Sequence, residues 1–323
     1  MKAGVKIMFS SKRFIRETSK ELKKYKGKAI IAVSGGVDST VACALVYKAF
    51  RNRLKAVFVD TGLLRKGEVQ EVVSKFKKLK MRVKVVDAKK KFLTALKGVT
   101  EPEKKRKIIG KVFIDIFNKE AKSFGAKYLV QGTIAPDWIE SGFGIRDTIK
   151  SHHNVGGLPK RMKLELIEPL RDLYKDEVRR IARELNVLST HFWAQPFPGP
   201  GLAIRILGEV TPEKLFLCKE SNAIVCSEIF SSFKRKEIKA LPWQYFAVVL
   251  NSKSVGIQGD VRAYGYTVAI RAVEATDGLT ALYSPLPQKL LQKISIRITN
   301  ELKNVNRIVY DVTHKPPASI EWE

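Results

Sequence analysis

The residues whose types and spacing are best suited to bind a reacting group form one short stretch, Ser34-Gly35-Gly36-Val37-Asp38-Ser39-Thr40. The two glycines lack Cβ atoms, so phosphate oxygens can approach the backbone closely. The three hydroxyl side chains add hydrogen-bond donors. Asp38 is the exception, because a carboxylate that faces a phosphate is repelled unless a cation lies between them. We therefore predict that Asp38 binds Mg²⁺, an ion that prefers oxygen ligands.

The flanking residues predict how this stretch is held. An apolar run at residues 29–33 predicts a buried parallel strand, and apolar and small residues at helical spacing predict a helix over residues 37–50. A strand, a glycine turn and a helix aim free N–H groups at an anion. An ordinary tight turn is the alternative for two glycines alone. The stretch has neither the Lys of the common nucleotide-binding loop nor the three-glycine dinucleotide spacing.

The alternation of strand and helix continues through the first half of the chain. Predicted strands occupy residues 54–59, 83–86, 128–131 and 164–168, and predicted helices occupy residues 14–25, 68–79, 92–96 and 107–124 and begin again near Tyr174. This order predicts an α/β fold with a doubly wound parallel sheet. Ser34, Asp60, Asp87 and Gln131 should then line one rim of the sheet, with a nucleotide base bound near Val59.

Composition sets broad limits on function. With 323 residues and 45% hydrophobic residues, the chain can form two domains with a sizeable core. No apolar run approaches a membrane span, and no secretory signal is recognisable at residues 1–9. The three cysteines are odd in number and lie in helix-like contexts, so they fit buried free thiols in a reducing cytoplasm. No Cys-x-x-Cys pair exists, which disfavours a zinc knuckle or a redox pair.

The formal charge of +28 permits two interpretations. A basic chain can bind nucleic acid, or its lysines can form a solvated surface on a protein with phosphate-rich substrates. The Lys clusters at residues 75–78, 89–91 and 104–107 are spread through amphipathic segments, without a basic tail or a nucleic-acid-reading motif. We therefore favour the second interpretation.

Residues 132–160 are turn-rich and predict a lid, because long irregular loops in compact domains are often functional. Gly142, Gly144, Gly156 and Gly157 would permit the hinge motion of a closing lid. The adjacent His152 and His153 could also form a solvated turn or a metal pair. Zinc is disfavoured, since neighbouring rings cannot readily face one ion and no third ligand is evident.

The chain changes character after residue 190. The run Gln195-Pro196-Phe197-Pro198-Gly199-Pro200-Gly201 predicts a stiff, extended crossing. Beyond it, predicted strands at residues 204–210, 255–266, 268–274 and 307–313 and helices at residues 212–230 and 287–301 indicate an α+β domain. We expect a first domain at residues 1–190, a crossing at 191–201 and a smaller second domain at 202–323. Residues 243–250 could form a contact between protomers or a core segment.

Four stretches carry a family resemblance. Ser34-Gly35-Gly36-Val37-Asp38-Ser39 resembles the signature loop of the N-type ATP pyrophosphatases, which have the adenine nucleotide alpha hydrolase-like fold. The proline run, the predicted lid and Asp311-Val312-Thr313-His314-Lys315-Pro316-Pro317-Ala318-Ser319-Ile320-Glu321-Trp322-Glu323 together resemble the ATP pyrophosphatase part of the GMP synthetases. The resemblance covers nearly the whole chain from Arg13 onward. The glutaminase domain is absent, as in the archaeal two-subunit arrangement.

The resemblance implies a reaction, its cofactors and its partners. XMP would be adenylylated on its C2 oxygen by ATP with Mg²⁺, and ammonia from a separate glutaminase subunit would then displace AMP. The products would be GMP, AMP and pyrophosphate. The family also implies a cytoplasmic homodimer joined through the second domain.

The resemblance also implies residue roles. The Ser34–Thr40 stretch and Val59 would bind ATP. Lys175 would contact phosphate, and Asp172 would orient Lys175. Glu177 would be a second Mg²⁺ ligand. The matching lid positions are Asp137, Glu140, Lys150, His152 and His153. The matching XMP positions are Arg205, Gln258, Lys315 and Glu321. Helix capping is the alternative for Asp172 and Glu177, and an exposed strand position is the alternative for Arg205.

The chain departs from its relatives at two points. Many carry Arg-His where this chain has Ala194-Gln195, and some carry Arg or Tyr where it has Ala135. NAD synthetase, argininosuccinate synthetase and the tRNA-modifying pyrophosphatases are alternatives within the fold. The tRNA thiolases would explain the charge, but they need reactive cysteines near the ATP loop, and Cys43 is expected on a buried helix. A non-catalytic RNA-binding module would leave Asp38 and Lys175 without a role.

Overall fold

The computed structural model describes residues 9–136, 164–187, 195–258, 261–276 and 278–323. The chain divides into two compact units. The first unit comprises Met1–Asp60, Val69–Asp87 and Phe113–Ser189, and the second comprises Thr61–Glu68, Ala88–Val112 and Thr190–Glu323. The five predicted lid residues Asp137, Glu140, Lys150, His152 and His153 lie outside the described residues.

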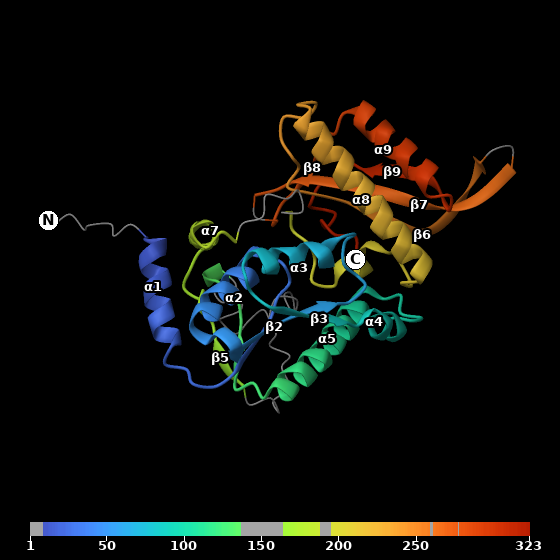
Figure 1. The fold of residues 1–323 in the computed structure, drawn as a ribbon. Helices are drawn as coiled ribbons and strands as arrows, with labels where there is room; N and C mark the ends of the chain where they lie inside the picture. The colour runs from blue at the N-terminus through green and yellow to red at the C-terminus, as the bar shows by residue number, and fades with distance from the viewer. Residues whose placement is uncertain (1–8, 137–163, 188–194, 259–260, 277) are drawn as a thin grey trace. The chain divides into compact units, whose positions relative to one another are not determined.

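The first unit is built on a five-stranded sheet in the order β3-β2-β1-β4-β5 (Figure 1). The strands are β1 (Ala29–Ala32), β2 (Leu54–Asp60), β3 (Val83–Asp87), β4 (Tyr128–Val130) and β5 (Glu165–Ile167). All four pairings are parallel, which confirms the predicted doubly wound sheet. The chain runs outward from β1 to β3 and returns on the other side of β1. The topological switch point, where such sheets bind ligands, therefore lies between β1 and β4.

Helices flank this sheet. They are α1 (Ser11–Leu22), α2 (Val37–Phe50), α3 (Glu68–Lys78), α5 (Pro102–Phe124) and α7 (Lys175–Glu184), with a 3₁₀ turn η1 (Arg51–Arg53) after α2. Right-handed crossovers place α2 and α3 on one face and the C-terminal half of α5 on the other. The α2 helix is buried over most of its length because small residues such as Ala42 and Ala44 let it pack closely, and it contacts α1 and α7.

The second unit has its own four-stranded sheet (Figure 1). It consists of β6 (Gln244–Gln258), β7 (Val261–Glu274), β8 (Leu282–Tyr283) and β9 (Val305–Asp311), with α8 (Pro212–Lys234) and α9 (Gln288–Glu301) packed beside it. The β6–β7 and β7–β8 pairs are antiparallel and the β7–β9 pair is parallel. The unit also contains α4 (Lys89–Ala95), the N-terminal half of α5 and the 3₁₀ helix η4 (Gly201–Arg205).

Three sequence interpretations of the second unit need correction. Residues 204–210 do not form a strand: η4 ends at Arg205, and only an isolated bridge joins Ile206 to Val249. The predicted strand 255–266 is divided between two antiparallel strands, β6 and β7. Gln258 of β6 pairs with Val261 of β7. For residues 243–250 the core alternative replaces the interface one, because Phe246 and Val248 belong to the buried core with Ile320.

Candidate active site

The phosphate-binding stretch is a tight, internally bonded loop at the N-terminus of α2. The Ser34 N–H donates to the Ser39 hydroxyl (3.3 Å), and the Gly36 N–H donates to the Ser34 hydroxyl (3.3 Å). The Thr40 hydroxyl donates to the Gly36 carbonyl (2.6 Å). The N–H groups of the first helical turn lack intrahelical partners, which makes the loop ready to bind an anion.

Two glycines have no room for a side chain around this loop. Gly35 has φ +79°, and a Cβ there would lie 2.6 Å from Val72 Cγ2 in α3. Gly132 follows β4, and its Cβ would lie 3.0 Å from the backbone nitrogen of Ser39. The loop after β4 therefore packs directly against the N-terminus of α2. This contact puts the phosphate loop at the switch point between β1 and β4.

Asp38 projects from the first turn of α2 and forms an ion pair with Lys175 of α7 through its Oδ2 atom. The other oxygen, Oδ1, is buried and has no hydrogen-bond partner among the described residues. The Asp38 side chain is 26% exposed and that of Lys175 is 47% exposed. The carboxylate thus keeps one free oxygen, and the ammonium remains open to an anion.

The other two predicted phosphate-site residues, Glu177 and Asp172, have no described polar contact with Asp38 or Lys175. Glu177 accepts a hydrogen bond from the Tyr174 N–H (2.9 Å), so it caps the N-terminus of α7. Asp172 is exposed, and the described partner of Lys175 is Asp38 rather than Asp172. The capping alternative for Glu177 is therefore realised in the structure.

In the second unit, the structure brings two predicted XMP residues together. Arg205 is 1% exposed and donates to both carboxylate oxygens of Glu321, with Nε–Oε2 at 3.0 Å and Nη2–Oε1 at 2.7 Å. The Gln244 side chain donates to the same carboxylate (2.9 Å). The guanidinium lies 4.0 Å from the ring centroid of Phe246. The exposed-strand alternative for Arg205 is therefore wrong.

Lys315 lies in the same segment as Glu321 but is held differently. Its ammonium is half-buried and donates to the Gly278 carbonyl (2.6 Å). The segment is also fixed by Arg271, which is fully buried, pairs with Asp311 and donates to the Thr313 and Ser319 carbonyls. The backbone of Gln258 ends β6, whereas its side chain lies outside the described residues.

The proline run is anchored to the second unit. Gln195 accepts a hydrogen bond from the Tyr245 N–H (2.7 Å). The Gly201 N–H donates to the Pro198 carbonyl (2.9 Å), so it is already used within the turn. The glycines of this run therefore offer a ligand fewer donors than the sequence alone indicates.

The three cysteines are buried free thiols, as predicted. Burial raises the pKa of Cys43 and of Cys218 from 9.0 to about 12, and that of Cys226 to about 11. The thiolate is the nucleophilic form, so none of the three is suited to sulfur transfer at neutral pH.

Sequence reasoning missed three polar contacts of these regions. Lys75 of α3 donates to the Gly35 carbonyl of the phosphate loop (2.8 Å). Gln244 supports Glu321, and Lys105 binds Glu323. Both lysines belong to clusters interpreted as solvated. One signal was available: Lys105 falls at helical spacing with Ile109, Val112 and Ile116, which are all buried.

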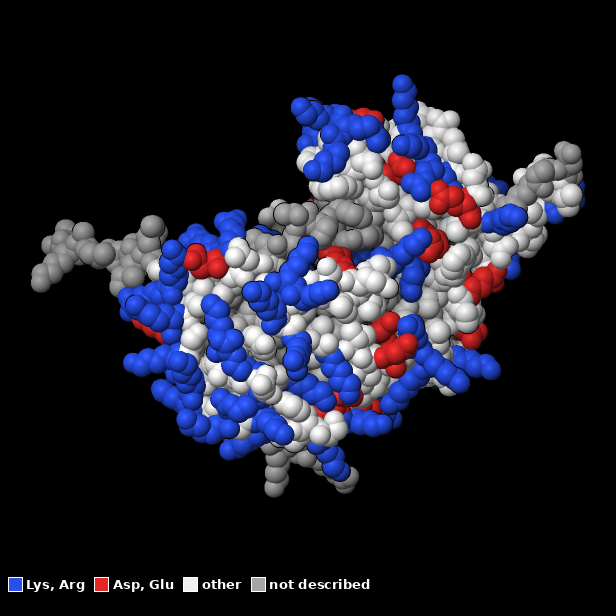
Figure 2. Space-filling model, in the orientation of Figure 1, with Lys and Arg blue, Asp and Glu red and all other residues white. Residues whose placement is uncertain are grey.

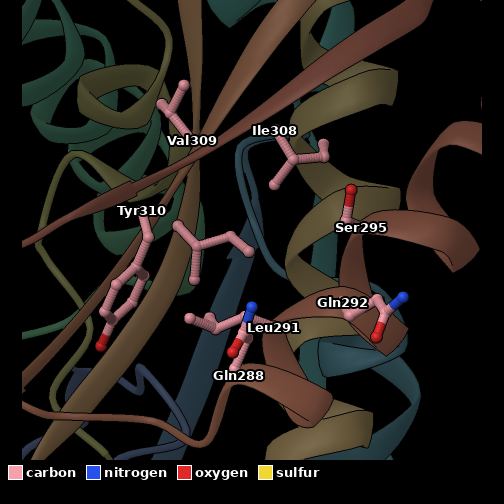
Figure 3. Close-up of a pocket in the computed structure, with 8 residues that line it drawn as sticks. Gln288, Leu291, Gln292, Ser295, Ile308, Val309 and Tyr310 are labelled. Carbon is pink, nitrogen blue, oxygen red and sulfur yellow. The ribbon is translucent and has the colours of Figure 1, made fainter.

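Two hollows lie in the second unit. One, of about 390 Å³, lies between α9 and β9 and is lined by Leu291, Ile308 and Tyr310 among others (Figure 3). The second, of about 530 Å³, is bordered by Lys214, Asn251 and Tyr264 among others. Neither hollow is lined by a predicted site residue.

Lys and Arg side chains are spread across the visible face of the molecule, with few acidic residues among them (Figure 2). They cover the face broadly instead of gathering in one patch. Among the described residues, no helix has the length and apolarity needed to cross a membrane.

Comparison with known proteins covers both units. A family described as the PP-loop domain matches residues 9–189, and a family described as the GMP synthase C terminal domain matches residues 231–322. One of the subunits of the GMP synthase (glutamine-hydrolyzing) of Thermoplasma acidophilum is 56% identical over 315 residues, which are 97% of this chain and 100% of that protein. The protein of the same name from Pyrococcus furiosus is 54% identical over 326 residues, 100% of each chain. GMP synthase (glutamine-hydrolyzing) of Clostridium tetani is 54% identical over 314 residues, which are 96% of this chain but 61% of that protein.

Proposed function

The chain belongs to the family of GMP synthase subunits that these relatives represent, and from that premise we propose that it catalyses the amination of XMP. It is a C–N ligase that uses ATP to convert XMP and ammonia into GMP, AMP and pyrophosphate. The observation that carries this proposal is the PP-loop with Asp38 and Lys175 at the switch point of the first unit. The loop presents N–H donors and one ammonium to a polyphosphate.

The chemistry explains why ATP is cleaved between its α and β phosphates. The C2 oxygen of XMP is a poor leaving group, so it attacks the α-phosphorus and expels pyrophosphate. The C2–O bond to the new adenylyl group then breaks as ammonia attacks C2, and AMP leaves. Positive groups that face the transferring phosphoryl stabilise the charge that develops on it. Lys175 and the N-terminus of α2 supply these groups in this chain.

The residues around Asp38 fit a Mg²⁺ ion. The buried Oδ1 atom has no hydrogen-bond partner among the described residues, and a hard cation prefers such a carboxylate oxygen. In the described parts of the chain, no three His, Cys, Asp or Glu side chains form a metal cluster. Asp38 would therefore hold the ion together with phosphate oxygens and water, with Glu177 as the second proposed ligand. When bound, Mg²⁺ neutralises charge on the leaving pyrophosphate.

XMP is proposed to bind through Arg205, Gln258, Lys315 and Glu321. The Glu321 carboxylate can accept hydrogen bonds from base N–H groups, while the Lys315 ammonium suits the 5′-phosphate. Arg205 already donates two hydrogen bonds to Glu321. Its proposed role is therefore to hold that carboxylate in place, and not to bind the 5′-phosphate of XMP. Asp172 is proposed to orient Lys175 when ATP is bound. Asp137, Glu140, Lys150, His152 and His153 are proposed to form a lid that excludes water from the adenylyl intermediate.

A separate glutaminase subunit is the proposed ammonia source. The two relatives that are named as subunits match this chain over their full length, and their names specify glutamine hydrolysis. We place the functional domains at residues 1–190 and 202–323, joined by the crossing at 191–201, in a cytoplasmic enzyme.

The proposed homodimer uses the second domain. Exposed apolar side chains lie on the β6–β7 ribbon, with Ile257 78% exposed and Val261 and Tyr264 each 70% exposed. Such a patch is typical of an interface. Ile257→Asp is expected to shift the mass measured by light scattering from dimer to monomer.

The test of function is product analysis with purified protein, XMP, ATP, Mg²⁺ and ammonium. GMP, AMP and pyrophosphate are expected in equal amounts. ATP cleavage that does not depend on XMP, or the absence of GMP, would refute the proposal. A tRNA thiolase is disfavoured because the Cys43 thiol, nine residues after Ser34, is buried and its pKa is raised.

A further inference from the structure

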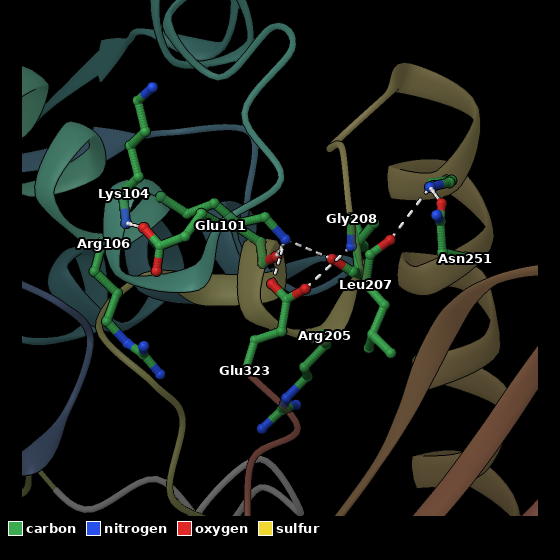
Figure 4. Close-up of polar contacts among 12 residues, drawn as sticks. Glu101, Lys104, Arg106, Arg205, Leu207, Gly208, Asn251 and Glu323 are labelled. Atoms are coloured by element: carbon green, nitrogen blue, oxygen red, sulfur yellow. Dashed lines mark hydrogen bonds and ion pairs between the residues drawn. The ribbon is translucent and has the colours of Figure 1, made fainter.

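Figure 4 shows the polar contacts around Glu323, one of which comes from a buried lysine of the second unit. Lys105 lies on the N-terminal half of α5 and is fully buried. Its ammonium donates to the Ile206 carbonyl (2.7 Å) and the Ala203 carbonyl (3.3 Å), and it forms an ion pair with Glu323. Three acceptors match the three donors of an ammonium group.

These partners flank the proposed XMP residues on both sides. Arg205 lies between the two acceptor carbonyls in sequence, and Glu321 precedes Glu323 by two residues. The second Glu323 oxygen accepts a hydrogen bond from the Gly208 N–H (3.1 Å). One ammonium therefore joins the backbone that carries Arg205 to the segment that carries Glu321.

The placement of this charge is costly, which argues for a specific role. Burial lowers the pKa of Lys105, and the hydrogen bond that its ammonium donates to Glu323 opposes that effect. The neighbouring positions on the same helix face, Ile109, Val112 and Ile116, are apolar and buried. An apolar residue at position 105 would pack with them but could not bind Glu323 or the two carbonyls.

We propose that Lys105 is a positioning residue for XMP binding, which it supports by tying Glu323 to the Ala203–Ile206 backbone. The bidentate Arg205–Glu321 pair depends on the relative position of these two segments, and a small misplacement of a binding group weakens binding strongly. This inference rests on the proposed function. It adds a residue of α5 that touches neither substrate.

The test compares Lys105→Met and the double variant Lys105→Met/Glu323→Gln with the wild type. The double variant removes both charges, so it leaves no unpaired carboxylate that could prevent folding. Lys104→Met is the matched control, because Lys104 is exposed and its side chain points away from the network (Figure 4). We expect both Lys105 variants to raise the KM for XMP by about tenfold or more. The KM for ATP should stay within about twofold, and the control should behave as wild type.

A second readout does not depend on catalysis. Amide hydrogen exchange over residues 319–323 is expected to be faster in the double variant than in Lys104→Met, because the tie that holds this segment is lost. A folded double variant with wild-type KM for XMP, or with unchanged exchange, would overturn the inference. A wild-type protein that makes no GMP from XMP would instead refute the proposed function, while the exchange result would still report on the tie.

Discussion

The two proposed binding regions are built in opposite ways. Within the Ser34–Thr40 stretch, hydrogen bonds join groups no more than five residues apart, such as Ser34 and Ser39. Lys75 and Lys175 reach this stretch from other helices, and the Asp38–Lys175 pair stays partly exposed. In the XMP region, the pairs that matter span 116 residues for Arg205–Glu321 and 218 residues for Lys105–Glu323, and the cations are buried. The phosphate loop is thus an open region formed largely by a local stretch of sequence. The XMP region is a closed region formed by contacts between distant segments.

The difference follows from what each region must receive. A polyphosphate brings several negative charges, so its loop offers N–H donors and an accessible ammonium without neutralising them in advance. The proposed XMP region must instead fix the carboxylate of Glu321, which we propose recognises a planar base. Buried guanidinium and ammonium groups do this because a bidentate pair in a low-dielectric interior has a defined geometry.

The largest expected effect comes from the open region. Asp38→Asn should retain the fold but lower XMP-dependent GMP formation by at least about 10²-fold, because the carboxylate that pairs with Lys175 and suits Mg²⁺ is lost. Initial rates at saturating ATP and Mg²⁺ measure this. Asp176→Asn, at an exposed acid in the first turn of α7, is the matched control and should stay near wild type. Near-wild-type activity of Asp38→Asn would contradict the proposal that the open region binds ATP and Mg²⁺.

The second effect belongs to the closed region. Arg205→Met should destabilise the protein by about 3 kcal/mol, since it leaves the Glu321 carboxylate without its main partner. Glu321→Gln keeps the shape of the side chain, so it should fold better and mainly raise the KM for XMP. Thermal unfolding and steady-state kinetics separate the two outcomes. If Arg205→Met unfolds at the wild-type temperature, the buried pair is not the support that we describe.

A smaller effect should change the KM for ATP but not the KM for XMP, which distinguishes the two regions. Gly132→Ala places a Cβ 3.0 Å from the Ser39 nitrogen, so it should displace the phosphate loop and raise the KM for ATP by about fivefold, or about 1 kcal/mol. The KM for XMP should change little. Gly110→Ala is the control: no described atom lies within 4 Å of its added Cβ, and alanine favours the helix by about 1 kcal/mol. Equal changes in both KM values would contradict a separate phosphate loop.

The last effect is a pH dependence of stability that is absent at neutral pH. The pKa of Cys43 is raised from 9.0 to about 12 by burial, so the folded state keeps its proton while the unfolded thiol ionises. Its contribution to stability is full below pH 9 and is lost between pH 9 and 12, by up to about 1.4 kcal/mol per pH unit. Thermal unfolding at pH 7.5 and 10 should therefore show a smaller loss for Cys43→Ala than for wild type. Equal losses would show that Cys43 ionises as readily in the folded state.

Sequence predicted the open region well because its determinants are consecutive. The strand, the glycine turn and the helix over residues 37–50 follow from local periodicity, and the parallel order follows from alternation. Asp38 and Lys175 were both identified, although their direct pairing was not.

The closed region was harder to predict for a physical reason. Arg205 was predicted to contact XMP, but nothing near it in sequence reveals that its guanidinium pairs with a carboxylate 116 residues later. Lys105 was placed with solvated lysines, although its spacing with Ile109 and Val112 marks a buried face. The division of residues 255–266 between β6 and β7 was missed because exposed apolar residues such as Ile257 and Val261 resemble one continuous strand. Long-range pairing is set by tertiary structure, which local patterns do not encode.

The most direct test of the account follows one oxygen atom. XMP labelled with ¹⁸O at C2 is incubated with the protein, unlabelled ATP, Mg²⁺ and ammonium, and the products are analysed by mass spectrometry. Adenylylation of XMP should place one ¹⁸O atom in the phosphate of AMP for each GMP formed, because the C2 oxygen attacks the α-phosphorus and leaves with AMP. Label in inorganic phosphate or pyrophosphate, or label released to water with unlabelled AMP, would contradict adenylylation of XMP by this chain.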